Sequence, residues 1–120
     1  MKTLMILSMA MALLASPSWG YKQEDLDKLA AINTCQKCDL AGADLHLAYL
    51  REAYLREANL EKANLEKAIL TKANLAGADL RGTVLTGAVL RDAKIDFADF
   101  TKAKFCNTVM PDGQRIFKDC

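Results

Sequence analysis

The chain has 120 residues, with 16 Lys and Arg against 15 Asp and Glu, so its formal net charge is only +1. This balance argues against a nucleic-acid-binding surface, which is usually a basic field, and equally against a strongly acidic mimic of nucleic acid. A chain of this length is predicted to hold one domain.

Residues 1–20, "MKTLMILSMAMALLASPSWG", have the layout of a secretory signal peptide. Lys2 supplies the charged start, an apolar run follows, and Ser18 and Gly20 are the small residues of a cleavage site after Gly20. A membrane anchor is the alternative, but the run is shorter than the roughly 20 apolar residues that span a bilayer. The sequence therefore predicts export, and without Lys2 the exported part carries 15 basic and 15 acidic residues.

Residues 21–34 are predicted to form a short capping helix at the N-terminal end of the domain. Within "KQEDLDKLAAIN", acidic residues stand in the first turn, where they suit the helix dipole. Leu26, Leu29 and Ala30 recur at helical spacing and would form an apolar face against the first repeats.

A five-residue repeat occupies residues 38–112 without an insertion. A large residue returns at every fifth position: leucine from Leu40 to Leu90, then Ile95, Phe100, Phe105 and Met110. A small residue stands two places before each large one, and it is alanine in most units. The repeat comprises fifteen units in phase, each with one large and one small residue.

A regular helix or strand does not accommodate this spacing. Five residues advance a helix by about 500°, so successive leucines would scatter around its circumference. In a straight strand, positions five apart point to opposite faces, whereas the small and large residues of one unit share a face. The pattern works if the chain turns once per unit, so that every pair points inward. The sequence predicts a solenoid whose coils pair through backbone hydrogen bonds about 4.8 Å apart.

Three segments carry a specific resemblance: "CDLAGADL", "REANLEKANLEKA" and "TKANLAGADLRG". They resemble the pentapeptide-repeat family, whose unit is A-(D/N)-L-x-x. A CxxC at Cys35 and Cys38 and an ending like "FCNTVMPDG" resemble an exported subset of that family. The resemblance implies an all-β fold, a right-handed quadrilateral β-helix with four units per coil, over residues 35–112.

The C-terminal residues 113–120 follow a Pro-Asp-Gly turn signal and are predicted to form a capping tail. Ile116 and Phe117 would fold over the last coil and cover its open edge.

Four cysteines in an exported chain predict two disulfides, with three possible pairings. In the four-sided coil that the resemblance implies, Cys38 and Cys106 lie about 16 Å apart along the axis at strand spacing. Bonded Cα atoms lie within about 7 Å, so pairings across the ends are excluded and Cys35–Cys38 and Cys106–Cys120 are left. Cys38 also fits a core position as a free thiol, so the first of these pairs stays open.

Residues that carry chemistry are few. A CxxC can be a redox-active dithiol, but the βαβ frame that normally carries it is absent from the pattern. A four-cysteine zinc site needs every ligand about 2.3 Å from one ion, which the separation of the cysteines forbids. The one histidine, His46, stands in an outward position, and nearly all carboxylates stand beside lysine or arginine. We expect no catalytic residue, no metal site and no cofactor.

One outward position departs from the family's pattern. The residue just before each large one is usually Asp or Asn in the family, but six units carry an apolar residue instead: Tyr49, Tyr54, Ile69, Val84, Val89 and Val109. With four units per coil, Tyr49, Ile69, Val89 and Val109 stack into one stripe, beside a column of Asp and Asn at 39, 59, 79 and 99. A three-sided coil would align Tyr54, Ile69 and Val84 instead. The alternative is ordinary β-propensity without a contact role.

The sequence thus predicts a non-enzymatic exported protein, in the periplasm or outside the cell, that acts as a structural or interaction module. Its expected contacts are a protein partner or a second copy through a flat face, with no nucleic acid, and no membrane after signal cleavage. Two other functions are the topoisomerase-inhibiting role of some pentapeptide-repeat proteins, which imitate DNA, and a thiol-redox role for the CxxC. The leader and the zero net charge argue against the first.

Overall fold

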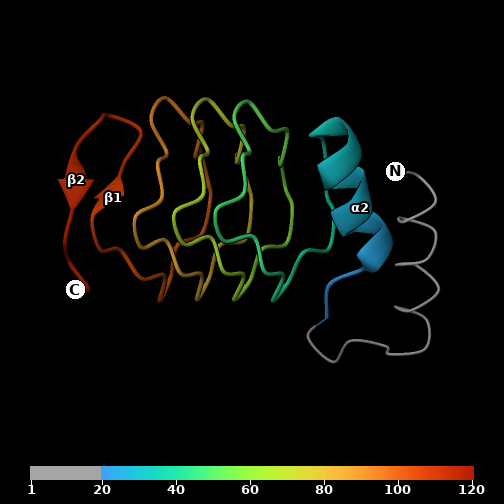
Figure 1. Ribbon diagram of the computed structural model, residues 1–120, viewed down its shortest axis with the longest axis horizontal. Helices are drawn as coiled ribbons and strands as arrows, with labels where there is room; N and C mark the ends of the chain where they lie inside the picture. Colours follow the sequence, from blue (N-terminus) through green and yellow to red (C-terminus); the bar gives the residue numbers. More distant parts are fainter. Residues whose placement is uncertain (1–19) are drawn as a thin grey trace.

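The computed structural model describes residues 20–120, which form a helix, a stack of coils and a short hairpin in chain order (Figure 1). The helix, α2, spans Gln23–Ile32, and the hairpin consists of β1 (Thr108–Val109) and β2 (Arg115–Ile116). The predicted leader, apart from Gly20, lies outside the described residues. No helix in residues 20–120 is long and apolar enough to cross a membrane.

The coils are held together by parallel bridges between residues 20 apart, from Thr34–Tyr54 to Val89–Val109. Twenty residues are four units, so each coil has four sides, as the resemblance implied. In each unit, the residue before the large one pairs with the neighbouring coil through its own N–H and C=O. For Asp79, the C=O accepts from Leu60 N–H at 2.7 Å, and the N–H donates to Ala58 C=O at 2.9 Å. Because the paired stretch is so short, the described coils contain bridges rather than long strands.

Each unit ends in a corner, which is held by backbone hydrogen bonds within the unit and to the next coil. The N–H of the small residue donates to the C=O of the preceding large residue, as Ala63 does to Leu60 at 2.9 Å. Two residues after each large one except Met110, the backbone has a positive φ, for example +59° at Lys62. Such a conformation costs an L-residue roughly 1–2 kcal/mol. The N–H of Lys62 also donates to Arg81 C=O at 2.8 Å, and this bond to the next coil offsets the strain.

The large and small residues of the repeat point inward and form one continuous core. Every leucine from Leu40 to Leu90 at the repeat spacing is buried. Thr83 and Thr108 replace alanine in two units and are fully buried, and each hydroxyl donates to a backbone C=O, at 2.9 and 2.6 Å. The polar atoms inside the tube are therefore satisfied.

At the N-terminal end, α2 lies against the first coil (Figure 1). Leu29 is buried in the common core, and Leu26 packs against it. The helix is shorter than the predicted 21–34, because Lys22 is extended and its N–H donates to Asp39 C=O at 3.0 Å. The carboxylate of Asp25 accepts the Asp39 N–H at 2.8 Å, so this side of the open edge is satisfied.

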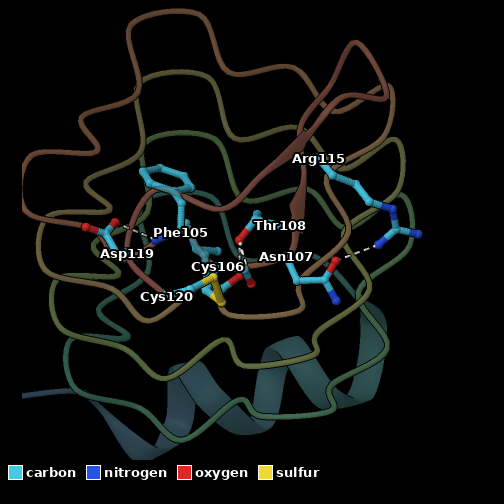
Figure 2. The surroundings of a disulfide bond; sticks show 8 residues. Phe105, Cys106, Asn107, Thr108, Arg115, Asp119 and Cys120 are labelled. Carbon is cyan, nitrogen blue, oxygen red and sulfur yellow. Dashed lines mark hydrogen bonds between the residues drawn. A yellow bond between two sulfur atoms is a disulfide. The ribbon is translucent and has the colours of Figure 1, made fainter.

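At the C-terminal end, the chain turns back as the β1–β2 hairpin, in which Val109 pairs with Arg115. The Asp119 carboxylate accepts the Phe105 N–H at 2.9 Å, and Asp119 N–H donates to Phe105 C=O at 2.7 Å (Figure 2). Ile116 packs partly buried against the core, but Phe117 is 60% exposed. The prediction that Phe117 folds over the last coil is wrong. The β1–β2 hairpin and Asp119 contact the edge of the last coil instead.

Two disulfides are present, Cys35–Cys38 and Cys106–Cys120, with Cα–Cα distances of 5.1 and 4.9 Å. Cys38 occupies the core position and forms the disulfide there, so the pairing with Cys35 is confirmed and the alternative of a free thiol is wrong. The second disulfide ties the C-terminal residue to the last coil beside the Asp119 contacts (Figure 2).

Candidate interaction surface

The four sides of the coil differ in the outward residue that precedes each large one. Two sides matter here. The acidic side carries Asp39, Asn59, Asp79 and Asp99, and the apolar side carries Tyr49, Ile69, Val89 and Val109. Their bridges start two units apart in a four-unit coil, so the two sides are opposite each other. The predicted placement of one column beside the other is therefore corrected.

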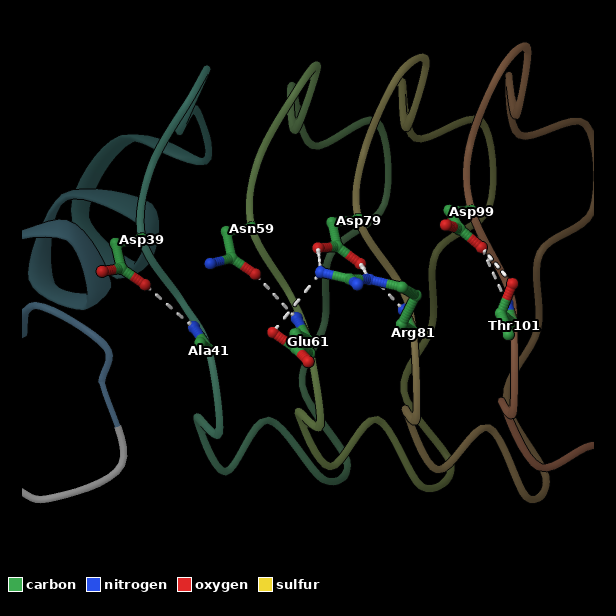
Figure 3. A network of polar contacts seen from close by, with 8 residues as sticks. All are labelled: Asp39, Ala41, Asn59, Glu61, Asp79, Arg81, Asp99 and Thr101. Atoms are coloured by element: carbon green, nitrogen blue, oxygen red, sulfur yellow. Dashed lines mark hydrogen bonds and ion pairs between the residues drawn. The ribbon is translucent and has the colours of Figure 1, made fainter.

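On the acidic side, each Asp or Asn side chain accepts the N–H two residues later (Figure 3). The acceptor–donor pairs are Asp39–Ala41, Asn59–Glu61, Asp79–Arg81 and Asp99–Thr101, at 3.3, 3.0, 3.1 and 3.0 Å. This bond closes a local turn at the corner of the coil. It gives a physical reason for the family's preference for Asp or Asn at this position.

Arg81 links two coils on the acidic side. Its guanidinium contacts the Asp79 carboxylate at 2.7 Å and the Glu61 carboxylate of the neighbouring coil at 3.6 Å (Figure 3). The hydrogen bond from Arg81 lowers the pKa of Asp79 below its usual value. The Thr101 hydroxyl similarly lowers the pKa of Asp99. These carboxylates are held ionised by local partners, which stabilises the register and supplies no proton donor near neutral pH.

The apolar side is exposed at its N-terminal end and covered at its C-terminal end. Tyr49 is 72% exposed, Ile69 and Val89 are half-buried, and Val109 is only 3% exposed. Val109 belongs to β1, which pairs with β2. The surface stripe therefore consists of Tyr49, Ile69 and Val89, and Val109 must be removed from the predicted contact set.

The apolar side lacks in every described coil the corner bond that each of the other three sides has in at least one coil. Within residues 20–120, the side chains that accept from the N–H two residues later at this position are Asp39, Asp44, Asn59, Asn64, Asn74, Asp79 and Asp99. None of them lies on the apolar side. A hydrogen bond of this kind contributes about 0.5–1.5 kcal/mol, so this side forgoes local stabilisation in every coil.

A groove of about 610 Å³ lies between α2 and the first coil, next to the apolar side. Leu26 and Ile32 line it from the helix, and Leu45, Tyr49 and Arg51 line it from the coil. Sequence reasoning missed this feature because it depends on where α2 sits. The available signal was Ile32, a large apolar residue that ends the helix after Leu29 and is left 61% exposed.

The structure does not bring together the residues that were candidates for catalysis, redox activity or metal binding. The His46 ring nitrogen lies 2.9 Å from the Asp44 carboxylate, a contact that lowers the pKa of Asp44. In the described part of the chain, no group of three or more His, Cys, Asp and Glu is placed to hold a metal ion. Cys35 and Cys38 are buried, whereas reactive thiols are at least partly accessible.

A model of pentapeptide repeats matches residues 34–72 and 68–107, in eight copies. The chain belongs to the pentapeptide-repeat family. Members of this family fold as right-handed quadrilateral β-helices, and they are generally structural or interaction modules rather than enzymes. No curated protein matches the chain significantly.

Solved pentapeptide-repeat structures are similar to it in sequence. HetL, from the cyanobacterium Nostoc sp. strain PCC 7120 and involved in heterocyst differentiation regulation, is 32% identical over 69% of this chain, with a TM-score of 0.43. This chain spans only 43% of HetL. The protein alr5209, also from Nostoc PCC 7120, is 30% identical over 66% of this chain and 69% of its own, with a TM-score of 0.40. A thylakoid lumen protein of Arabidopsis thaliana, AT2G44920, is 25% identical over 66% of both chains, with a TM-score of 0.29.

Proposed function

We propose that this pentapeptide-repeat protein is a non-enzymatic interaction module that binds a protein partner, or a second copy, through its apolar side. One observation carries the proposal: the apolar side forgoes the corner hydrogen bond in each coil and presents Tyr49, Ile69 and Val89 instead. An apolar column that is partly exposed on a rigid side is typical of a contact surface. β-propensity alone does not explain why Tyr49, Ile69 and Val89, which replace the family's Asp or Asn, all lie on the same side.

The dimensions of the molecule suit such a contact. Its principal extents are 42 × 24 × 22 Å. A side of 42 by 22 Å offers roughly the 800 Å² per partner that a stable interface buries. In this proposal α2 and the C-terminal tail are caps, which keep the open ends of the coil from pairing with other chains.

The proposal places the protein outside the cytoplasm, in the periplasm or the extracellular space. The signal-like residues 1–20 support this location, and so do two disulfides in a chain of four cysteines. The CxxC and the C-terminal ending, which resemble an exported subset of the family, point the same way. The balanced charge does not favour inhibition of a topoisomerase by DNA mimicry.

The test is a pair of matched double variants. Ile69→Lys with Val89→Lys puts two charges into the apolar side, and we expect it to abolish partner recovery from envelope extract or to halve the solution mass of a dimer. Tyr54→Lys with Val84→Lys makes the same kind of change at the same repeat position on two other sides. It should leave both measurements unchanged. Equal behaviour of the two variants, with unchanged mass and unchanged partners, would contradict the proposal.

A further inference from the structure

The first coil has an open backbone edge at Tyr49. In the next coil, the N–H of Ile69 donates to Ala48 C=O at 2.9 Å, and Ile69 C=O accepts from Leu50 at 2.7 Å. Tyr49 occupies the same place one coil earlier, so its N–H and C=O point toward the end of the stack. Within residues 20–120, neither group has a hydrogen-bond partner. Asp39 on the same edge is satisfied by Asp25 and Lys22, whereas the N–H and C=O of Asp44, like those of Tyr49, have no partner within residues 20–120.

The groove described above lies beside this open edge. Its walls are the apolar residues Leu26 and Ile32 of α2 and Leu45 of the first coil, with Tyr49 at the rim. Ile32 is 61% exposed, so an apolar surface remains uncovered there. An open strand edge next to an apolar groove is the combination used when an extended peptide adds a strand to a sheet.

One cationic residue, Arg51, lies at the rim of the groove. Arg51 lines it, and the Arg51 C=O accepts the Asn33 side-chain N–H at 2.9 Å, which fixes the backbone there. In the described chain, the Arg51 guanidinium makes no ion pair. An unpaired guanidinium suits a carboxylate, which it can bind through two parallel hydrogen bonds.

We propose that this groove binds an extended peptide segment of a partner protein, with an apolar side chain in the groove and a carboxylate at Arg51. The peptide backbone pairs with the N–H and C=O of Tyr49 as an added strand. A second copy fits less well, because an end of the molecule measures only 24 by 22 Å, below the roughly 800 Å² per partner of a stable dimer. The inference rests on the proposed function, that the protein is an interaction module, but uses the groove and the Tyr49 backbone rather than the side chains of Ile69 and Val89.

The test measures binding of eight-residue fluorescent peptides by anisotropy to the purified, oxidised protein. The peptides alternate threonine with valine, leucine or phenylalanine and end in a free carboxylate. We expect at least one to bind, and Ile32→Glu to weaken that binding at least tenfold. Arg51→Gln should weaken it several-fold, and should have no effect on the same peptide with a C-terminal amide. Phe97→Glu is the matched control, because Phe97 is 97% exposed and does not line the groove.

Several results would overturn the assignment. These are no binding by any peptide, equal binding by wild type and Ile32→Glu, and equal binding by peptides whose central amide N–H is replaced by proline. A dimer that Ile32→Glu dissociates would assign the groove to a second copy. Tighter binding of a peptide of residues 1–19 than of every alternating peptide would assign it to the chain's own leader. The apolar-side variants at 69 and 89 leave the groove intact, so failure of one proposal is distinguishable from failure of the other.

Discussion

Leu70→Asp is expected to unfold the protein. Leu70 is fully buried in the middle of the stack. Its burial contributes about 1.5–3 kcal/mol, and an unpaired carboxylate in its place costs several kcal/mol more. A domain of this size is stable by only about 5–15 kcal/mol. Each coil is also stabilised by its neighbours, so a broken middle coil leaves two short stacks with exposed ends.

The measurement is far-ultraviolet circular dichroism with thermal melting. Lys72→Asp is the matched control, because it introduces the same side chain two residues later at an exposed corner. Lys72 has a φ of +62°, a conformation that aspartate tolerates better than most residues. We expect the control to melt close to the wild type. A wild-type spectrum and melting curve for Leu70→Asp would show that Leu70 does not point inward.

Removing the Cys106–Cys120 disulfide is expected to have the second largest effect. The bond closes a loop with a sequence separation of 14, for which chain entropy gives roughly 3 kcal/mol. In a domain of about 100 residues this lowers the melting temperature by about 12–24 °C. Without the bond, the Asp119 contacts to Phe105 must hold the C-terminal tail alone.

The variant is Cys106→Ser with Cys120→Ser, compared with wild type by thermal melting and limited trypsin digestion. We expect early cleavage after Arg115 and Lys118 while the coils keep their spectrum, because release of the tail is a local opening. Reduction of the wild type should reproduce the cleavage. An unchanged melting temperature together with unchanged resistance to trypsin would mean that the tail is not held by this bond.

The coil could be predicted from the sequence because its signal is local and repeated. The spacing of leucine rules out helix and strand by angle alone, and it identifies Leu40 to Leu90 as interior residues, all of which are buried. The number of sides came from the family resemblance. The bridge from Tyr49 to Ile69 supports four sides, whereas three would have aligned Tyr54 with Ile69.

The ends of the molecule could be predicted only in outline. A repeat says which residues point inward, but not how a helix or tail outside the repeat meets the first and last coils. The Asp25 and Asp119 contacts depend on tertiary placement, as do the burial of Val109 and the exposure of Phe117. The groove beside Tyr49 escaped prediction for the same reason, since its second wall is α2.

Hydrogen-bond scalar couplings measured by nuclear magnetic resonance test the central geometry most directly. We expect a coupling between the amide nitrogen of Leu60 and the carbonyl carbon of Asp79, where the donor and acceptor lie 2.7 Å apart. The same shift of 19 residues should connect Leu70 to Val89. Couplings that instead join each amide to the carbonyl four residues earlier would identify α-helix in the repeat, and would contradict a backbone that bends once in every unit.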